Sequence, residues 1–205
     1  VYLFGEKVEN PVDHPIIRPS ANALAETYDL GVSNPELATV ISPYTKERVS
    51  RFLHVSMSAH ELVLQNKMQR RLGQLTGTCF QRCVGMDAFN SLFSVTYEMD
   101  DALKTNYHKR LISFLTMMHK LNGVVGGAMT DVKGDRSLSP HQQKDKDLFV
   151  HVSRRTKEGV YIKGAKAHQT GTVNSHWMIV MPTMRLKKED HDYAVIGAVP
   201  VDAEG

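Results

Sequence analysis

The sequence predicts an α+β protein in which helices come first and strands follow. Apolar residues recur at helical spacing up to about Asn122–Gly123, and short β-branched or alternating runs follow that point. The last such run ends close to Gly205, so we expect an incomplete sheet and a chain that is a fragment. We expect a helical N-terminal domain over residues 1–123 and a β-rich domain over residues 124–205.

Capping residues and apolar stripes predict five helices in the first domain. Ser20 follows Pro19 and would cap the first helix, which Gly31 is placed to end. Asn122–Gly123 is a stop signal for the last helix. The four later helices are expected at residues 46–54, 60–75, 78–103 and 107–121.

Four strands are expected in the second domain. Residues 147–152 and 160–162 flank a Lys–Glu–Gly turn and predict a hairpin. Further strands are expected at residues 176–181 and 193–199, and residues 187–190 are expected to form a solvated turn.

Composition and charge exclude several classes of protein. The 205 residues are 41% hydrophobic and 23% charged, and the formal net charge is only +3. These are ordinary values for a globular protein, and the basic residues are too dispersed for a nucleic-acid-binding tail. No apolar run approaches the roughly 18–20 residues that cross a bilayer, and no signal peptide opens the chain. Two cysteines do not make a disulfide scaffold, so we expect a cytoplasmic protein with no nucleic-acid or membrane partner.

Two cysteines within Thr78–Cys83 form the first chemical signal. On a helix, Cys79 and Cys83 would share a face with Cβ atoms roughly 5–6 Å apart, whereas a disulfide requires roughly 3.5–4.5 Å. Thiolates at this spacing suit two irons of one cubane cluster, and zinc is the competing metal. Spacing alone favours two small buried side chains, and a cluster needs two ligands more.

Two polar segments form the second and third signals. Residues 128–137 combine a hydroxyl group, a glycine and alternating charges, which would suit a phosphate or a flavin ring edge but also fit a surface turn. Residues 166–171 place His168 and Thr170 between two strands, where they would hold a cofactor heteroatom or form an ordinary polar connection.

All three signals occur together in one family. The matching segments are residues 78–89 (TCFQRCVGMDAF), 128–136 (AMTDVKGDR), 164–171 (GAKAHQTG), 4–19 (FGEKVENPVDHPIIRP) and 174–183 (NSHWMIVMPT). They resemble the 4-hydroxybutyryl-CoA dehydratase family nearly from end to end. The related flavin-dependent 4-hydroxyphenylacetate 3-hydroxylases share the TD-x-x-GDR type of loop but have no iron–sulfur cluster. The pair Cys79 and Cys83 is therefore the discriminating feature.

The resemblance implies an acyl-CoA-dehydrogenase-like architecture. A helical N-terminal domain would be followed by an antiparallel β-barrel middle domain, truncated here, and the C-terminal helical domain would be missing. The family also implies a homotetramer when the protein is full-length.

Site residues follow from the resemblance, position by position. Cys79 and Cys83 match the first two of three cysteines that hold a [4Fe-4S] cluster together with one histidine, and Gln81 matches a position that lines the active site. The other cluster ligands and the catalytic acid/base residues would lie downstream, so the chain alone should be inactive. The FAD-binding positions would be Met129, Thr130, Asp131, Val132, Lys133, Gly134, Asp135, Arg136 and Thr170, with His168 beside them.

The implied reaction is the dehydration of 4-hydroxybutyryl-CoA to crotonyl-CoA, with isomerisation of vinylacetyl-CoA as a second activity. The family uses a flavin radical mechanism in which the cluster acts as a Lewis acid. Two other functions stay open at this point. One is a reduced-flavin-dependent aromatic hydroxylase of the 4-hydroxyphenylacetate 3-monooxygenase type, and the other is a non-catalytic interaction module with merely buried cysteines.

Overall fold

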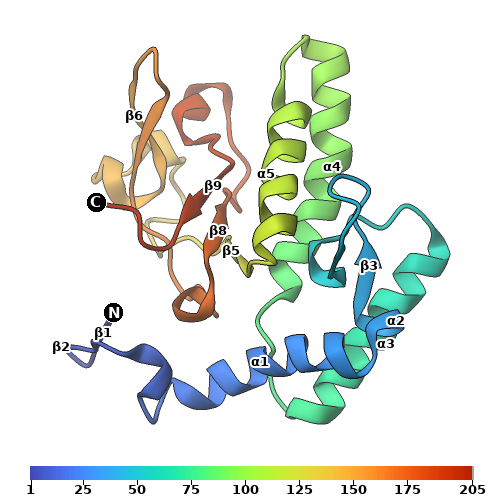
Figure 1. Cartoon of the computed structure of the whole chain (residues 1–205). Coiled ribbons are helices and arrows are strands. Elements are labelled where there is room, and N and C mark those ends of the chain that lie inside the picture. The colour runs from blue at the N-terminus through green and yellow to red at the C-terminus, as the bar shows by residue number, and fades with distance from the viewer. Residues whose placement is uncertain (205) are drawn as a thin grey trace. The chain divides into compact units, whose positions relative to one another are not determined.

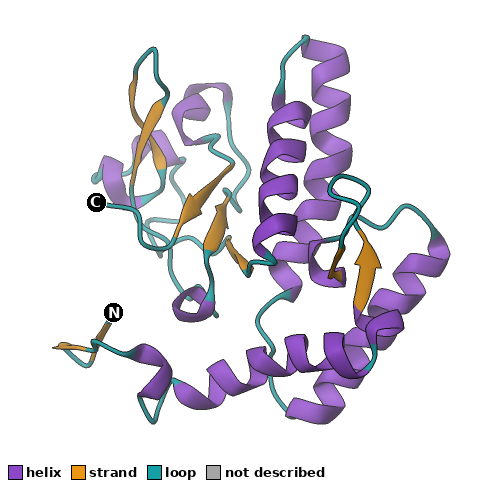
Figure 2. Ribbon diagram, in the orientation of Figure 1, coloured by secondary structure: helices purple, strands orange, loops and turns teal. Residues whose placement is uncertain are grey.

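The computed structural model describes residues 1–204 and combines helices with short strands (Figures 1 and 2). The chain divides into two compact units. The first comprises Val1–Gly126 together with Gly171–His176, and the second comprises Gly127–Thr170 together with the residues from Trp177 onward.

Helices dominate the first unit. They are α1 (Arg18–Ser33), α2 (Pro35–Ala38), α3 (Ala59–Thr76), α4 (Cys83–Leu103) and α5 (Tyr107–Leu121). Short antiparallel pairs accompany them: β1 (Tyr2–Leu3) with β2 (Glu6–Lys7), and β3 (Thr39–Ile41) with β4 (Arg48–Ser50).

Local capping explains where the best-predicted helices begin and end. The Ser58 side chain accepts a hydrogen bond from the Glu61 backbone N–H at 3.3 Å, and Gly77 ends α3 with φ of 61°. Asn122, with φ of 49°, ends α5 as its stop signal predicts. Ser20, in contrast, is not an N-cap, because α1 already begins at Arg18, and α1 continues past Gly31.

The helix predicted at residues 46–54 is wrong. These residues form β4 and a 3₁₀ helix, Arg51–Leu53. The reason is a turn that closes the β3–β4 hairpin: the Ser42 N–H donates to the Glu47 oxygen at 2.8 Å, and Lys46 takes a positive φ of 64°. Pairing with β3 therefore overrides the local helical preference of this segment.

The core of the first unit gathers side chains from α1, α2, α3, α4 and the segments between them. Its buried members are Leu30, Ala38, Phe52, Met68, Leu72, Phe80 and Met86, and Cys83 packs partly against them. The start of α4 is therefore fixed against this core.

Strands dominate the second unit. They are β6 (His151–Arg155), β7 (Val160–Lys163), β8 (Trp177–Val180), β9 (Gly197–Pro200) and the end of β5 (Val125–Ala128), whose first two residues belong to the first unit. They form one three-stranded sheet in the order β5–β8–β9 and one hairpin, β6–β7. The predicted hairpin and the strand at 176–181 are confirmed, and no closed sheet is described within residues 1–204.

Three predictions for the second unit need correction. Residues 146–148 form a 3₁₀ helix, so β6 starts later than expected, and β9 covers only the end of residues 193–199. In residues 187–190, Lys187, Lys188 and Glu189 are exposed as predicted, but Asp190 is completely buried and accepts hydrogen bonds from the Lys187 and His141 backbone N–H groups at 2.8 and 3.1 Å. A buried carboxylate of this kind is stable only with such partners.

Candidate functional site

The cysteine turn, residues 79–83, leads into α4: residues 79–82 are not helical and Cys83 is the first residue of the helix, so the prediction that both cysteines share one helical face is wrong. Gln81 has a positive φ of 63°. Phe80 and Arg82, on either side of Gln81, are both buried. The outer side of the turn carries Cys79, Gln81 and Cys83.

Arg82 anchors the turn from inside the first unit. Its side chain, 1% exposed, lies between the rings of Tyr28 and Phe52, at 4.8 and 4.9 Å from their centroids. It donates hydrogen bonds to Thr27 Oγ1 at 3.0 Å and to the Gly123 oxygen at 3.2 Å. Burial lowers the pKa of Arg82 to about 10, so the side chain is still a cation at neutral pH.

Both cysteines are free thiols. Cys79 is exposed and its Sγ accepts the Gln81 backbone N–H at 3.4 Å, whereas Cys83 is half-buried. Burial raises the pKa of the Cys83 thiol and the neighbouring Cys79 raises it further, against a smaller lowering by the backbone N–H of Val84. Cys83 is therefore a neutral thiol at pH 7, and a metal cation bound there would remove its proton.

The chemistry of the two donors fits a soft metal site that is completed from elsewhere. Two adjacent thiols supply half of the four ligands of a cubane cluster. Within residues 1–204, no group of three or more His, Cys, Asp or Glu side chains is placed to hold a metal ion.

Gln81 is held by residues that follow it by ninety or more positions. Its Oε1 atom accepts a hydrogen bond from Asn174 Nδ2 at 2.9 Å. The Gly171 backbone lies against the same side chain, because a Cβ atom on Gly171 would be 2.8 Å from Gln81 Cβ. These residues belong to the Gly171–His176 segment of the first unit.

In the second unit, the structure brings the two predicted flavin-contacting segments together. Asp131 and Lys166 form an antiparallel bridge. The Ala167 N–H and the Gln169 Nε2 group both donate to the Thr130 oxygen, at 3.0 and 2.9 Å. The loop that follows β5 and the segment that precedes Gly171 therefore form one structural feature.

A buried ion pair supports the beginning of this loop. Lys166 Nζ lies 2.6 Å from Asp131 Oδ1 and also donates to the Met129 and Met181 oxygens at 3.0 and 2.6 Å. The other Asp131 oxygen accepts from Thr183 Oγ1 at 2.9 Å. All three ammonium hydrogens and both carboxylate oxygens have partners inside the unit, so this pair stabilises the loop.

Gln143 supports the end of the loop. Its buried amide accepts from the Asp135 N–H at 3.1 Å and donates to the Asp135 oxygen at 2.8 Å. The Ser137 hydroxyl and N–H donate to the Asp135 carboxylate and lower its pKa. Gly134 is required by packing, because a Cβ there would lie 2.5 Å from Leu148 Cδ2.

The remaining predicted flavin contacts are mostly accessible. Neither Lys133 nor Arg136 has an ion-pair partner within residues 1–204, and both are exposed. His168 takes a positive φ of 54°, an uncommon conformation that tends to occur at functional positions. The exposed predicted contacts are Met129, Thr130, Lys133, Asp135, Arg136, His168 and Thr170, whereas Val132 is half-buried.

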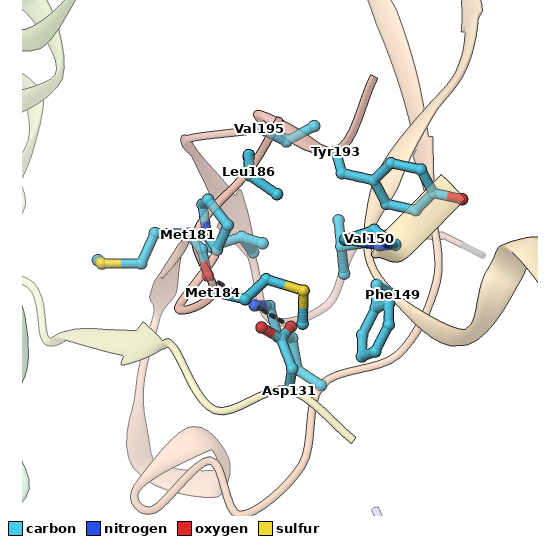
Figure 3. Close-up of a pocket in the computed structure, with 12 residues that line it drawn as sticks. Asp131, Phe149, Val150, Met181, Met184, Leu186, Tyr193 and Val195 are labelled. Carbon is cyan, nitrogen blue, oxygen red and sulfur yellow. Dashed lines mark hydrogen bonds and ion pairs between the residues drawn. The ribbon is translucent and has the colours of Figure 1, made fainter. Parts of the chain in front are cut away.

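A small hollow in the second unit lies beside the Asp131–Lys166 pair (Figure 3). Its other walls are mainly apolar and include Phe149, Val150, Met181, Met184, Leu186, Tyr193 and Val195. It has room for about one water molecule. It is therefore too small for a flavin ring or an acyl chain.

Sequence patterns did not assign roles to Arg82, Gln143, Lys166 or Asn174. Arg82 could have been found from the order of residues 79–83, in which the outward Cys79, Gln81 and Cys83 alternate with Phe80 and Arg82. That alternation places Arg82 on the inner side together with Phe80. The others act on residues distant in sequence, and no local pattern marks them. In the part of the chain described here, no helix has the length and apolar character needed to cross a bilayer.

Comparisons with known proteins identify two groups of relatives. A family model described as "4-hydroxyphenylacetate 3-hydroxylase N terminal" matches residues 1–205. The 4-hydroxybutyryl-CoA dehydratase/vinylacetyl-CoA-Delta-isomerase of Clostridium aminobutyricum is 50% identical over the whole chain, which covers 42% of that protein. A solved structure of an oxygen-tolerant archaeal 4-hydroxybutyryl-CoA dehydratase from N. maritimus is 60% identical with a TM-score of 0.97, and the chain covers 41% of it. The predicted resemblance to the dehydratases is confirmed.

The oxygenases are more distant. The oxygenase component of 4-hydroxyphenylacetate 3-monooxygenase from Klebsiella oxytoca is 24% identical over the whole chain, which covers 39% of it. A crystal structure of such a component, complexed with FAD, superposes with a TM-score of 0.77 at 19% identity, over 98% of this chain and 41% of that one. That likeness shows a shared fold. The chain thus spans about two fifths of the length of its relatives.

Proposed function

The chain belongs to the 4-hydroxyphenylacetate 3-hydroxylase N-terminal family, and we propose that it is the N-terminal part of a 4-hydroxybutyryl-CoA dehydratase that also isomerises vinylacetyl-CoA. Its much higher identity to dehydratases than to oxygenases supports this branch of the family. The activity is that of the longer protein, since the residues that move protons in the reaction are not assigned within this chain.

The cysteine turn is the observation that carries the proposal. Cys79 and Cys83 are free, close enough for Cys79 to raise the pKa of Cys83, and at least partly exposed on the outer side of one turn. Two structural cysteines would instead be expected inside the core. An aromatic hydroxylase of this family has no use for such a pair.

We assign Cys79 and Cys83 as two ligands of a [4Fe-4S] cluster, with a histidine and a third cysteine from the rest of the protein. When bound, the cluster would supply a Lewis acid for the substrate hydroxyl, and FAD would supply one-electron chemistry. The chain itself fixes the positions of the two sulfur atoms. The buried side chains of Phe80 and Arg82 do this by anchoring the turn in the core. Gln81, between them, would line the active site and orient the acyl-CoA substrate.

We assign the FAD contacts to residues 129–136 with His168 and Thr170. The unpaired cations of Lys133 and Arg136 would attract the anionic parts of FAD, and the exposed Thr130 and Thr170 hydroxyls would hydrogen-bond its heteroatoms. Met129 and Val132 are the apolar members of the loop. Asp131, Gly134 and Asp135 make its internal contacts. The backbone of the loop would bring N–H groups to the same cofactor.

The proposal includes the architecture of the whole protein. Residues 1–123 would be a helical N-terminal domain, and residues 124–205 the first part of a flavin-contacting, antiparallel β-barrel domain. A C-terminal helical domain would complete an acyl-CoA-dehydrogenase-like protein. We expect a cytoplasmic homotetramer that binds neither nucleic acid nor membrane.

Anaerobic purification of the full-length protein tests the proposal. We expect about four irons, about four sulfides and one FAD per chain, with conversion of 4-hydroxybutyryl-CoA to crotonyl-CoA. Cys79→Ala and Cys83→Ala should each lose iron and dehydratase activity together. Val84→Ala, an exposed neighbour, should keep both.

Three results would contradict this assignment. Unchanged iron in both cysteine variants would exclude the cluster ligands. A protein without iron that consumes oxygen with reduced flavin would be the aromatic hydroxylase. A full-length protein that retains neither flavin nor iron would be a non-catalytic module.

A further inference from the structure

A chain of three hydrogen bonds runs from α1 to Gln81 within the first unit. Ser20 Oγ donates to the Ile17 backbone oxygen at 2.8 Å. Asn174 Nδ2 then approaches both Ser20 Oγ and Gln81 Oε1, each at 2.9 Å. None of these contacts involves the cysteines.

The direction of every bond in this chain follows from its first member. A backbone oxygen can only accept, so the single Ser20 proton is used on Ile17. The Ser20 oxygen must therefore accept from Asn174, which turns the Asn174 amide so that its NH₂ group, not its oxygen, faces Ser20. The second hydrogen of that NH₂ group points to Gln81, which must accept with its oxygen.

The Gln81 amide is consequently held in one of its two orientations. Its oxygen is occupied by Asn174, and its Nε2 hydrogens have no acceptor within residues 1–204. Its backbone and stem are confined as well: φ is 63°, and Gly171 leaves no room, since a Cβ there would lie 2.8 Å from Gln81 Cβ and 3.1 Å from Gln81 Oε1. Gln81 is thus a preorganised donor on the cysteine turn.

We infer that Asn174 is a positioning residue that makes Gln81 present its NH₂ group, as an N–H donor, to an oxygen atom of the acyl substrate. The identity of that substrate rests on the proposed function. An N–H donor stabilises an oxygen on which negative charge develops, whereas a reversed amide would place a carbonyl oxygen there and repel it. Asn174 therefore determines the sign of the interaction without touching the substrate.

Asn174→Asp in the full-length holoenzyme is the sharpest test, because the two side chains have the same shape. An ionised carboxylate can only accept, so Gln81 would turn its NH₂ group toward it and its oxygen toward the substrate. We expect kcat to fall roughly 100-fold at pH 8, the usual scale for losing one such donor, with little change in KM. Iron and flavin content should stay at the wild-type level.

The pH profile separates this role from a structural one. A protonated carboxyl can donate to Gln81 Oε1 as Asn174 does, so the ratio of variant to wild-type kcat should rise as pH falls toward the carboxyl pKa. A ratio independent of pH, or a kcat within twofold of wild type at pH 8, would overturn the inference. Loss of iron or flavin in Asn174→Asp would also overturn it.

A double variant tests whether Asn174 acts through Gln81. Adding Asn174→Asp to Gln81→Ala should lower kcat no further than Gln81→Ala alone, because the group being positioned is already absent. A further loss of tenfold or more would show an independent role. Ser20→Ala, which frees the Asn174 amide to rotate, should give a smaller loss than Asn174→Asp.

A crystal structure keeps the inference testable if the proposed activity fails. If the wild-type full-length protein does not dehydrate 4-hydroxybutyryl-CoA, the proposed function is wrong and the positioning is judged from Asn174→Ala. Displacement or disorder of the Gln81 side chain in that structure would support it. A Gln81 side chain in its original place would overturn it.

Discussion

The cysteine turn and the Met129–Arg136 loop are supported in opposite ways. In the turn, residues of the motif itself supply the anchor, because Phe80 and Arg82 point into the core between outward neighbours. In the loop, the anchors come from outside the motif, namely Lys166 and Gln143. The turn inserts two of its own side chains into the core, whereas the loop is supported by side chains that follow it in the sequence.

This difference separates the motif residues that are free to contact the proposed cofactor from those that support the motif. In the turn, the anchoring side chains are buried, whereas the two cysteine side chains are at least partly accessible. In the loop, Asp131 is charged and belongs to the motif, yet both of its oxygens are used within the unit. Lys133 and Arg136 are the charged members with no such partner.

Removing the external anchor should have the largest effect on the loop. Lys166→Met leaves the buried Asp131 carboxylate uncompensated, which costs about 3 kcal/mol or more. We expect hydrogen exchange of peptides from residues 127–136 to become much faster. Lys163→Met removes an exposed partner of Asp147 and should change exchange very little. Equal effects of the two variants would contradict the importance of the buried pair.

Two arginines compare the turn with the loop directly. Arg82→Ala empties a fully buried site and leaves the Gly123 oxygen without its donor, so we expect a loss of about 3 kcal/mol. Arg136→Ala should alter stability by no more than about 0.5 kcal/mol and weaken FAD retention instead. Denaturant unfolding and flavin content measure the two outcomes. A destabilising Arg136→Ala with unchanged flavin content would reverse the assignment.

Two glycines give a smaller contrast. Gly134→Ala would place a methyl group 2.7 Å from Gln143 Oε1, and the resulting overpacking should cost about 1–3 kcal/mol and weaken FAD binding. Gly73→Ala, with open space around its Cβ position inside α3, should stabilise the protein by about 0.5–1 kcal/mol. Thermal unfolding, monitored by the release of flavin, distinguishes the two variants. A stabilising Gly134→Ala would contradict the packing argument.

The smallest expected effect is that of acid. Lowering the pH should reduce the stability of the two units in different pH ranges. Burial lowers the pKa of His119, whose Nδ1 lies 2.7 Å from Ser42 Oγ, so the unfolded state binds the proton first and stability falls as pH drops below about 6.5. Burial raises the pKa of Asp190, but bonds from Lys187 and His141 outweigh it and lower the pKa. That contribution is present above about pH 4 and is lost as pH falls further.

Hydrogen exchange of each unit at pH 8, 5.5 and 4 would follow this order. The first unit should lose protection between pH 8 and 5.5, and His119→Gln should reduce that loss. Protection in the second unit that falls in the same range would contradict the assignment to Asp190.

Predictions from sequence succeeded where neighbours in the chain determine the structure. α5 has the predicted bounds, since its apolar stripe and Asn122 are local signals, and α3 is nearly as well placed. The helix predicted at residues 46–54 failed because pairing with β3 decides the conformation there. The helix predicted at residues 78–103 ends where expected but begins only at Cys83, because Phe80 and Arg82 are both buried in a turn that precedes it.

The sequence by itself determined the longer helices α3 and α5, the strands after residue 123, the family, and the residue types at the candidate site, but not the short strands β1 to β4. Only the tertiary structure decided that the cysteines lie on a turn, that Asp131 is a support, and that Asn174 orients Gln81. The physical reason is range. Helix periodicity and capping act within a few residues, whereas burial and hydrogen-bond direction depend on groups that only folding brings together.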